Sequence, residues 1–179
     1  MSRSTHLAEA DGRGDAVGPA RLATLAGNLL LAALAVLVMG IVFTDAIRSD
    51  VVAIDLHQFY VTAQAIMRGD SPYLPTSAPL TEWGGPYPYP PLPALLAIPL
   101  TVMGFGAASL LVMALLVVVA LATLRVLDVH DWRCYALALL WPPVISAIQT
   151  GNLTLWFGLL LALAWRYRNG RVAAPACAF

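Results

Sequence analysis

Long apolar segments alternate with one long polar interval along this chain. Residues 22–44 form 23 consecutive positions without a charged side chain, more than the roughly 20 residues that a helix needs to cross a bilayer core. Residues 105–124 form a second uncharged run, and shorter apolar segments cover 134–148 and 153–165. The pattern predicts an all-α integral membrane protein.

The apolar segments predict four transmembrane helices, at about 22–46, 105–124, 133–148 and 153–165. Residues 91–103 are also apolar, but this segment is short for a membrane span. We expect it to be re-entrant or to lie at the membrane interface.

The predicted spans belong to one membrane domain at 22–172, with polar segments on either side of it. Residues 1–21 are polar and lack apolar periodicity, which predicts a disordered cytoplasmic tail. Residues 173–179 are expected to be a C-terminal tail. The first two spans are joined by the long polar interval, which we place outside the cytoplasm as a loop at 47–104.

This loop contains one stretch with the periodicity of a helix. The apolar side chains recur three or four positions apart, at Leu56, Phe59, Tyr60, Ala63, Ile66 and Met67. The spacing predicts an amphipathic helix lying along the membrane surface. Residues 70–91 are rich in proline and glycine and predict a packed irregular loop.

The composition is typical of an integral membrane protein and gives no sign of a nucleic-acid partner. Hydrophobic residues make up 60% and charged residues 11% of the chain, whereas soluble domains have about 45–50% and about 25%. The net charge is zero, so nothing in it favours a nucleic-acid partner. The sequence has no metal-ligand spacing and no glycine-rich phosphate loop, and we expect neither a metal nor a cofactor.

The arginines orient the chain in the membrane. If residues 91–103 return to the side from which they entered, all later arginines fall on one side, and the positive-inside rule makes that side cytoplasmic. These arginines are Arg125, Arg133, Arg166, Arg168 and Arg171. The prediction is a multi-pass plasma-membrane protein with a cytoplasmic N-terminus. The loop at 47–104 and a polar turn at 149–152 then share the outer side.

Three kinds of polar residue are candidates for chemistry on that side. Asp55 begins the predicted amphipathic helix, where it is either a helix N-cap or a general base. The tyrosines of the loop form an aromatic belt at the membrane surface or stack on a sugar or lipid. Gln149 and Asn152 either satisfy their own turn or hydrogen-bond a sugar in a recessed cavity.

Several motifs in order resemble a known family. They are D-L-H-Q-F-Y-V-T-A-Q-A-I-M-R-G-D-S-P-Y at 55–73, Y-P-Y-P-P-L-P at 87–93, W-P-P-V at 141–144 and Q-T-G-N-L-T-L-W at 149–156. Over residues 22–172 this set is similar to the N-terminal part of glycosyltransferase family 87. That family comprises bacterial mannosyltransferases of the GT-C membrane fold that use a polyprenyl-phosphate sugar.

The resemblance implies a function and a site. Asp55 would be the catalytic base of an inverting hexosyl transfer from the polyprenyl-phosphate donor to a lipid or glycan acceptor outside the cytoplasm. Residues implied to bind substrate near the active cavity are Tyr60, Tyr73, Tyr89, Gln149 and Asn152.

The chain departs from the family in having few spans and no lysine. We therefore expect an N-terminal fragment whose missing helices a second chain could supply. The alternatives are a non-catalytic polytopic membrane protein and a transporter-like element. A transporter is expected to carry ionisable residues inside its spans, and 105–124 and 134–165 have none.

Overall fold

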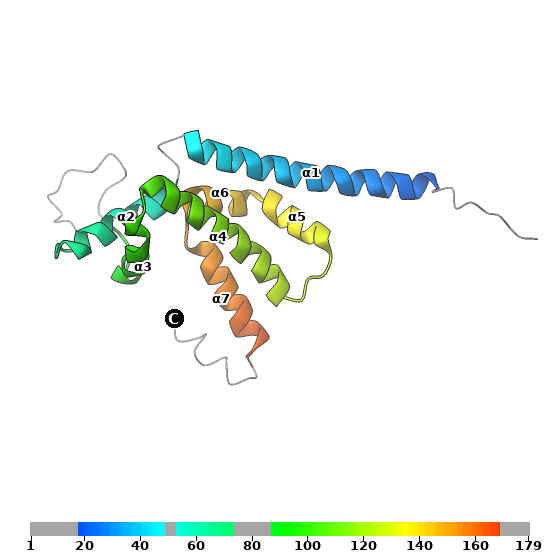
Figure 1. Ribbon diagram of the computed structural model, residues 1–179. Helices are drawn as coiled ribbons and strands as arrows, with labels where there is room; N and C mark the ends of the chain where they lie inside the picture. Colours follow the sequence, from blue (N-terminus) through cyan, green and yellow to red (C-terminus); the bar gives the residue numbers. More distant parts are fainter. Residues whose placement is uncertain (1–17, 49–52, 74–86, 169–179) are drawn as a thin grey trace, which may run out of the picture.

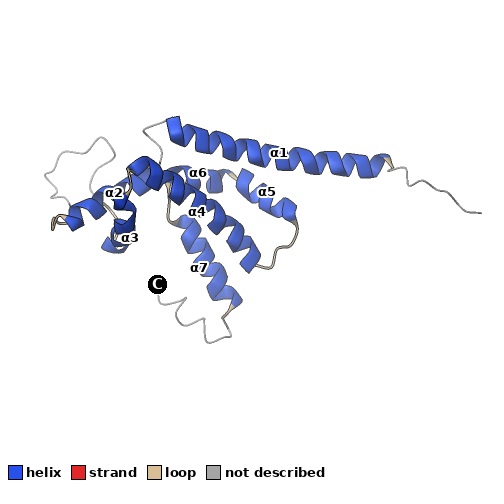
Figure 2. Cartoon of the chain, viewed as in Figure 1, coloured by secondary structure: helices blue, strands red, loops and turns tan. Residues whose placement is uncertain are grey.

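The computed structural model describes residues 18–48, 53–73 and 87–168, and this part of the chain consists of helices and their connections, without a strand (Figure 2). The predicted tail at 173–179 lies outside the described residues, as does most of the tail predicted at 1–21. Residues 19–21 of that tail instead begin the first helix. The predicted all-α architecture is confirmed.

Among the described residues, two helices are long and apolar enough to cross a membrane. Helix α1, Pro19–Arg48, has 30 residues and is apolar nearly all round, with only Ala35 and Val42 buried. Helix α4, Phe105–Val126, has 22 residues, a length of about 33 Å at 1.5 Å per residue. That length matches the roughly 30 Å core of a bilayer. Both predicted spans are thus present as continuous helices, and the chain is a membrane protein.

The span predicted at 133–148 is not a single helix. This region forms two helices, α5 at Trp132–Leu140 and α6 at Pro142–Thr150. Trp141 between them has an extended backbone (φ −74°, ψ 122°), because a residue before proline is disfavoured from the helical conformation.

The last predicted span corresponds to helix α7, Thr154–Arg166, which is bent by 118° relative to α6. The described residues therefore contain two helices able to span a membrane, or three if α6 and α7 together form one broken span. Four separate spans are not found in this part of the chain.

The path of the chain brings the start of α7 back to the start of α4. Helices α4 and α7 pack side by side and run in the same direction, while α5 and α6 run back along the side of α4 that faces α1 (Figure 1). Helix α1 packs against α5. The centre of this bundle holds Met113, Leu116 and Ile148, whose side chains are fully buried, with Val42 of α1 beside them.

A second apolar cluster holds the loop helices together at the start of α4. Helix α2, Ile54–Met67, forms where an amphipathic helix was predicted, and its apolar face is buried at Leu56, Phe59 and Ala63. Its location at the membrane surface stays a prediction. Helix α2 packs against helix α3, Pro91–Ala97, and the 3₁₀-helix η1, Ile98–Val102. The segment predicted as re-entrant or interfacial is thus two short helical pieces, and its placement at the membrane stays a prediction.

Candidate functional site

The first turn of α2 rests directly on the turn between α6 and α7. The backbone N–H of Ala53 donates to the carbonyl of Gln149 over 2.8 Å. Gly151 ends α6 in the left-handed conformation, with φ 69°. A Cβ at this position would lie 2.7 Å from Cβ of Leu56, so only glycine allows the two backbones to approach so closely.

Asp55 lies in the first turn of α2 and is half-buried. The helix N-cap is Ala53, and no described side chain caps this helix end, so the alternative that Asp55 is the N-cap is wrong. Its Oδ2 instead accepts a hydrogen bond of 2.7 Å from Nδ2 of Asn152, a residue 97 positions later. The positive end of the helix dipole also favours a carboxylate in this turn.

Asn152 is itself held by the start of α7. Its Oδ1 accepts from the backbone N–H of Thr154 over 2.8 Å and also from the Thr154 hydroxyl. The two ends of one amide side chain thus connect α7 to the carboxylate on α2.

The phenol of Tyr89 lies near enough to Asp55 to be affected by its charge. Burial first, and the negative charge of Asp55 second, raise the pKa of Tyr89 above its ordinary value of 10.0, so this phenol stays protonated at neutral pH. The Tyr89 ring packs edge-on against Phe59 with centroids 5.0 Å apart and lies 5.7 Å from the ring of Tyr87. The exposed Tyr73 reaches the Tyr89 carbonyl through its hydroxyl, over 3.4 Å.

The other two residues predicted to bind substrate, Tyr60 and Gln149, make contacts with the backbone. Tyr60 is buried, and its hydroxyl donates to the Met103 carbonyl over 2.7 Å, which ties α2 to the end of η1. Gln149 contributes its main-chain carbonyl to the contact with α2, and its side chain is half-buried. The structure thus brings Asp55 and Asn152 together and places Tyr89 within electrostatic range of Asp55. The Tyr60 hydroxyl is bonded to the backbone, and substrate binding by Tyr60 stays a prediction.

Three residues near this site were missed or misread in the sequence. Thr154 could have been found, since Asn followed two positions later by Thr at a helix start is typical of a side-chain-capped turn. His57, on the same helix as Asp55, packs edge-on against Phe105 at 4.9 Å, and burial lowers its pKa. Gln58 has a buried Oε1 that accepts no hydrogen bond within the described part of the chain.

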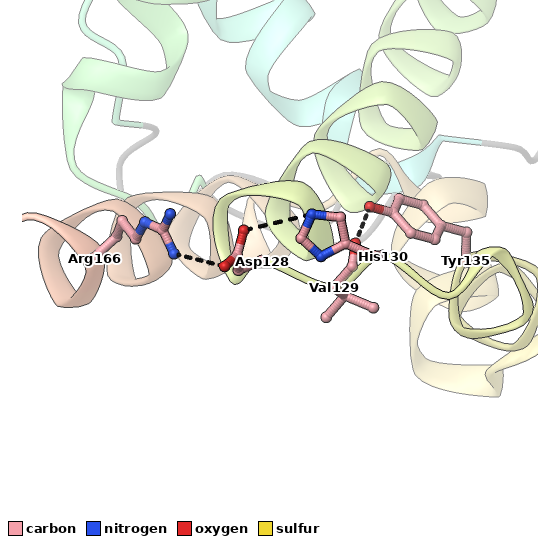
Figure 3. Close-up of polar contacts among 5 residues, drawn as sticks. All are labelled: Asp128, Val129, His130, Tyr135 and Arg166. Atoms are coloured by element: carbon pink, nitrogen blue, oxygen red, sulfur yellow. Dashed lines mark hydrogen bonds and ion pairs between the residues drawn. The ribbon is translucent and has the colours of Figure 1, made fainter.

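The arginines gather at the far end of α4, about 33 Å away for a helix of this length. There Asp128 lies between Arg166, at 3.6 Å, and His130, at 3.8 Å (Figure 3). A cavity of about 240 Å³ at this end is lined by Val126, Leu127, Trp165, Arg166 and Arg168. These ion pairs are exposed and contribute little to stability. Asp55 and these arginines therefore lie at opposite ends of the bundle, as the topology prediction requires.

No group of three or more histidine, cysteine, aspartate or glutamate side chains is placed to hold a metal ion within residues 18–48, 53–73 and 87–168.

A carboxylate held by an amide, with the phenol of Tyr89 nearby, is a site suited to hydroxyl chemistry. Comparison with models of known protein families identifies the family of this chain. The profile of glycosyltransferase family 87 matches residues 87–179, just over half of the chain, and the chain belongs to this family. The match includes Tyr89, Gln149 and Asn152, whereas Asp55 precedes it. Searches of curated proteins and of solved structures found no match.

Proposed function

We propose that this protein transfers a hexose, mannose by resemblance, from a polyprenyl-phosphate sugar to a hydroxyl of a lipid or glycan acceptor. The reaction takes place at Asp55, on the outer side of the plasma membrane, within a GT-C-type fold whose N-terminus is cytoplasmic. Membrane lipids or helices of a second chain cover the exposed apolar faces of α1, where Leu29 and Val36 are 71% and 74% exposed.

The chemistry requires one base. The acceptor oxygen forms a bond to the anomeric carbon as the bond from that carbon to the phosphate oxygen breaks. The polyprenyl phosphate leaves with the bonding electron pair, and the configuration of the anomeric carbon inverts. Asp55 takes the proton of the acceptor hydroxyl, a role that typically contributes about 10²- to 10⁴-fold to a rate.

The observation that carries this proposal is the 2.7 Å hydrogen bond between Asp55 and Asn152. It joins a half-buried carboxylate to a residue within the part of the chain that matches the glycosyltransferase family. The neighbouring Tyr89 supplies a protonated phenol and an aromatic face beside the carboxylate, both of which are suited to binding sugar hydroxyls and sugar rings.

The test is sugar transfer in membranes from cells that produce this protein, with radiolabelled polyprenyl-phosphate mannose and an extracted lipid acceptor. Because Asp55→Asn keeps the shape of the side chain but removes the base, we expect it to lower the rate by about 10²- to 10⁴-fold. Polyprenyl-phosphate glucose in a parallel assay identifies the preferred sugar.

Asp70→Asn is the matched control. Asp70 follows the same helix, but its carboxylate is 60% exposed and pairs with Arg68 at 3.2 Å, so transfer should be unchanged. The proposal is overturned if Asp55→Asn transfers sugar as fast as the wild type. It is equally overturned if wild-type membranes transfer no more than membranes that lack the protein.

A further inference from the structure

The amide of Asn152 has an orientation that its neighbours determine. A backbone N–H, such as that of Thr154, can only donate, so the Asn152 atom facing it is the carbonyl oxygen. The other end of the amide is then the NH₂ group, which faces Oδ2 of Asp55. An ionised carboxylate can only accept, so each contact has the correct donor and acceptor.

The backbone around Asn152 is held to α2 at two further points. Ala53 donates to the Gln149 carbonyl just before the first turn of α2, and Gly151 lies against Leu56. The turn at 149–152 and the start of α2 therefore cannot move independently without breaking a backbone hydrogen bond. The position of Asp55 relative to α7 is set by this contact.

From these contacts we propose that Asn152 is a positioning residue for Asp55 and that Thr154 orients Asn152 for this role. The inference rests on the function proposed above and changes the part of Asn152 in it, from binding the sugar to holding the base. Asn152 occupies Oδ2, which leaves Oδ1 of Asp55 to take the proton from the acceptor hydroxyl. No described residue donates to that second oxygen.

A positioning role and a binding role predict different kinetics. Misplacing a reacting group by about 1 Å can cost on the order of 10²-fold in rate. Asn152→Ser should therefore lower kcat by about 10- to 100-fold with little change in KM for the donor or the acceptor. Serine still offers an oxygen to the Thr154 backbone but is too short to reach Asp55, so the turn itself is kept.

Variants of Thr154, and the Asn152→Ser substitution made in the Asp55→Asn protein, make the test specific. Thr154→Val keeps the backbone donor and removes the hydroxyl, so it should lower kcat by less than Asn152→Ser does, while Thr154→Ser restores the wild-type rate. Thr123→Val in α4, whose hydroxyl donates to the Val119 carbonyl of its own helix near the arginine end, is the control and should be neutral. In the Asp55→Asn background, Asn152→Ser should change the residual rate by less than about twofold, because there is no base left to position.

Three results would overturn the inference, and they are distinguishable. A raised KM with unchanged kcat in Asn152→Ser means that Asn152 binds substrate. An inactive Asp55→Asn beside a fully active Asn152→Ser removes only the positioning role. A fully active Asp55→Asn removes the proposed function and the positioning role together. The amount of each variant in the membrane and its thermal transition are measured alongside, so that a lost fold is not mistaken for a lost rate.

Discussion

The contact between Gly151 and α2 allows a sharp test of how the site is built. Alanine at 151 meets two obstacles. Its backbone has φ 69°, and its Cβ would lie 2.7 Å from Cβ of Leu56 and 3.4 Å from the Leu56 nitrogen. Because the Cβ of Leu56 is bonded directly to the backbone, it cannot rotate away, and relief requires α2 itself to move.

The size of the effect follows from these two terms. A left-handed backbone costs a non-glycine residue about 1–2 kcal/mol, and an overpacked contact typically adds about 1–3 kcal/mol. Gly151→Ala should therefore lower the free energy of unfolding by about 2–5 kcal/mol. Moving α2 also lengthens the Asp55–Asn152 hydrogen bond, so sugar transfer should fall as well.

Gly69→Ala separates the two terms. Gly69 also has a left-handed backbone, with φ 84°, but no described atom lies within 4 Å of its added Cβ. In this variant the free energy of unfolding should fall by only about 1–2 kcal/mol, and the transfer activity should be unchanged. The assay is the thermal transition of each variant in detergent, followed by tryptophan fluorescence, together with the transfer rate. Equal destabilisation by the two substitutions would refute the close packing of the turn on α2.

Three further predictions concern α2. Burial lowers the pKa of His57 below 6.5, so the imidazole binds a proton more readily in the unfolded chain than in the folded one. The stability that neutral His57 contributes above pH 6.5 is therefore lost as the pH falls. His57→Gln should show a smaller drop in thermal transition between pH 7.5 and 5.5; equal drops would contradict this. Phe59→Ala should lower the free energy of unfolding by about 3–5 kcal/mol in urea, because Phe59 is only 3% exposed. Val61→Ala, at a position 43% exposed, should lower it far less. Similar urea midpoints for the two variants would argue against the buried face of α2. Tyr60→Phe removes the hydrogen bond to Met103 and should lower the free energy of unfolding by about 0.5–1.5 kcal/mol while leaving KM unchanged. A raised KM would show that Tyr60 contributes to substrate binding.

Much of the fold follows from local sequence because membrane spans and amphipathic helices depend on local sequence. The uncharged run at 22–44 predicted α1, and the recurrence of apolar residues after Asp55 predicted the buried face of α2. Counting arginines even placed Asp55 and the turn at 149–152 on one side, because charge distribution constrains how a chain crosses a membrane. The segment 133–148 was assigned to one span from its hydropathy, but it forms two helices because a residue before proline is disfavoured from the helical conformation.

The candidate site depends on contacts that no local pattern contains. Asp55 and Asn152 are 97 residues apart, and a shared side of the membrane does not by itself bring two side chains within hydrogen-bonding distance. Their contact requires the bend between α6 and α7, the close approach that Gly151 permits, and the orientation that Thr154 imposes on the Asn152 amide.

Length, hydropathy and periodicity are properties of short segments, so the sequence alone indicates a helical membrane protein with an acidic residue at the start of an amphipathic helix. The tertiary structure adds which amide holds that carboxylate and that the Tyr60 hydroxyl bonds the Met103 carbonyl. A hydrogen bond is sensitive to tenths of an ångström, and only the packing of α2 against the α6–α7 turn controls distance on that scale.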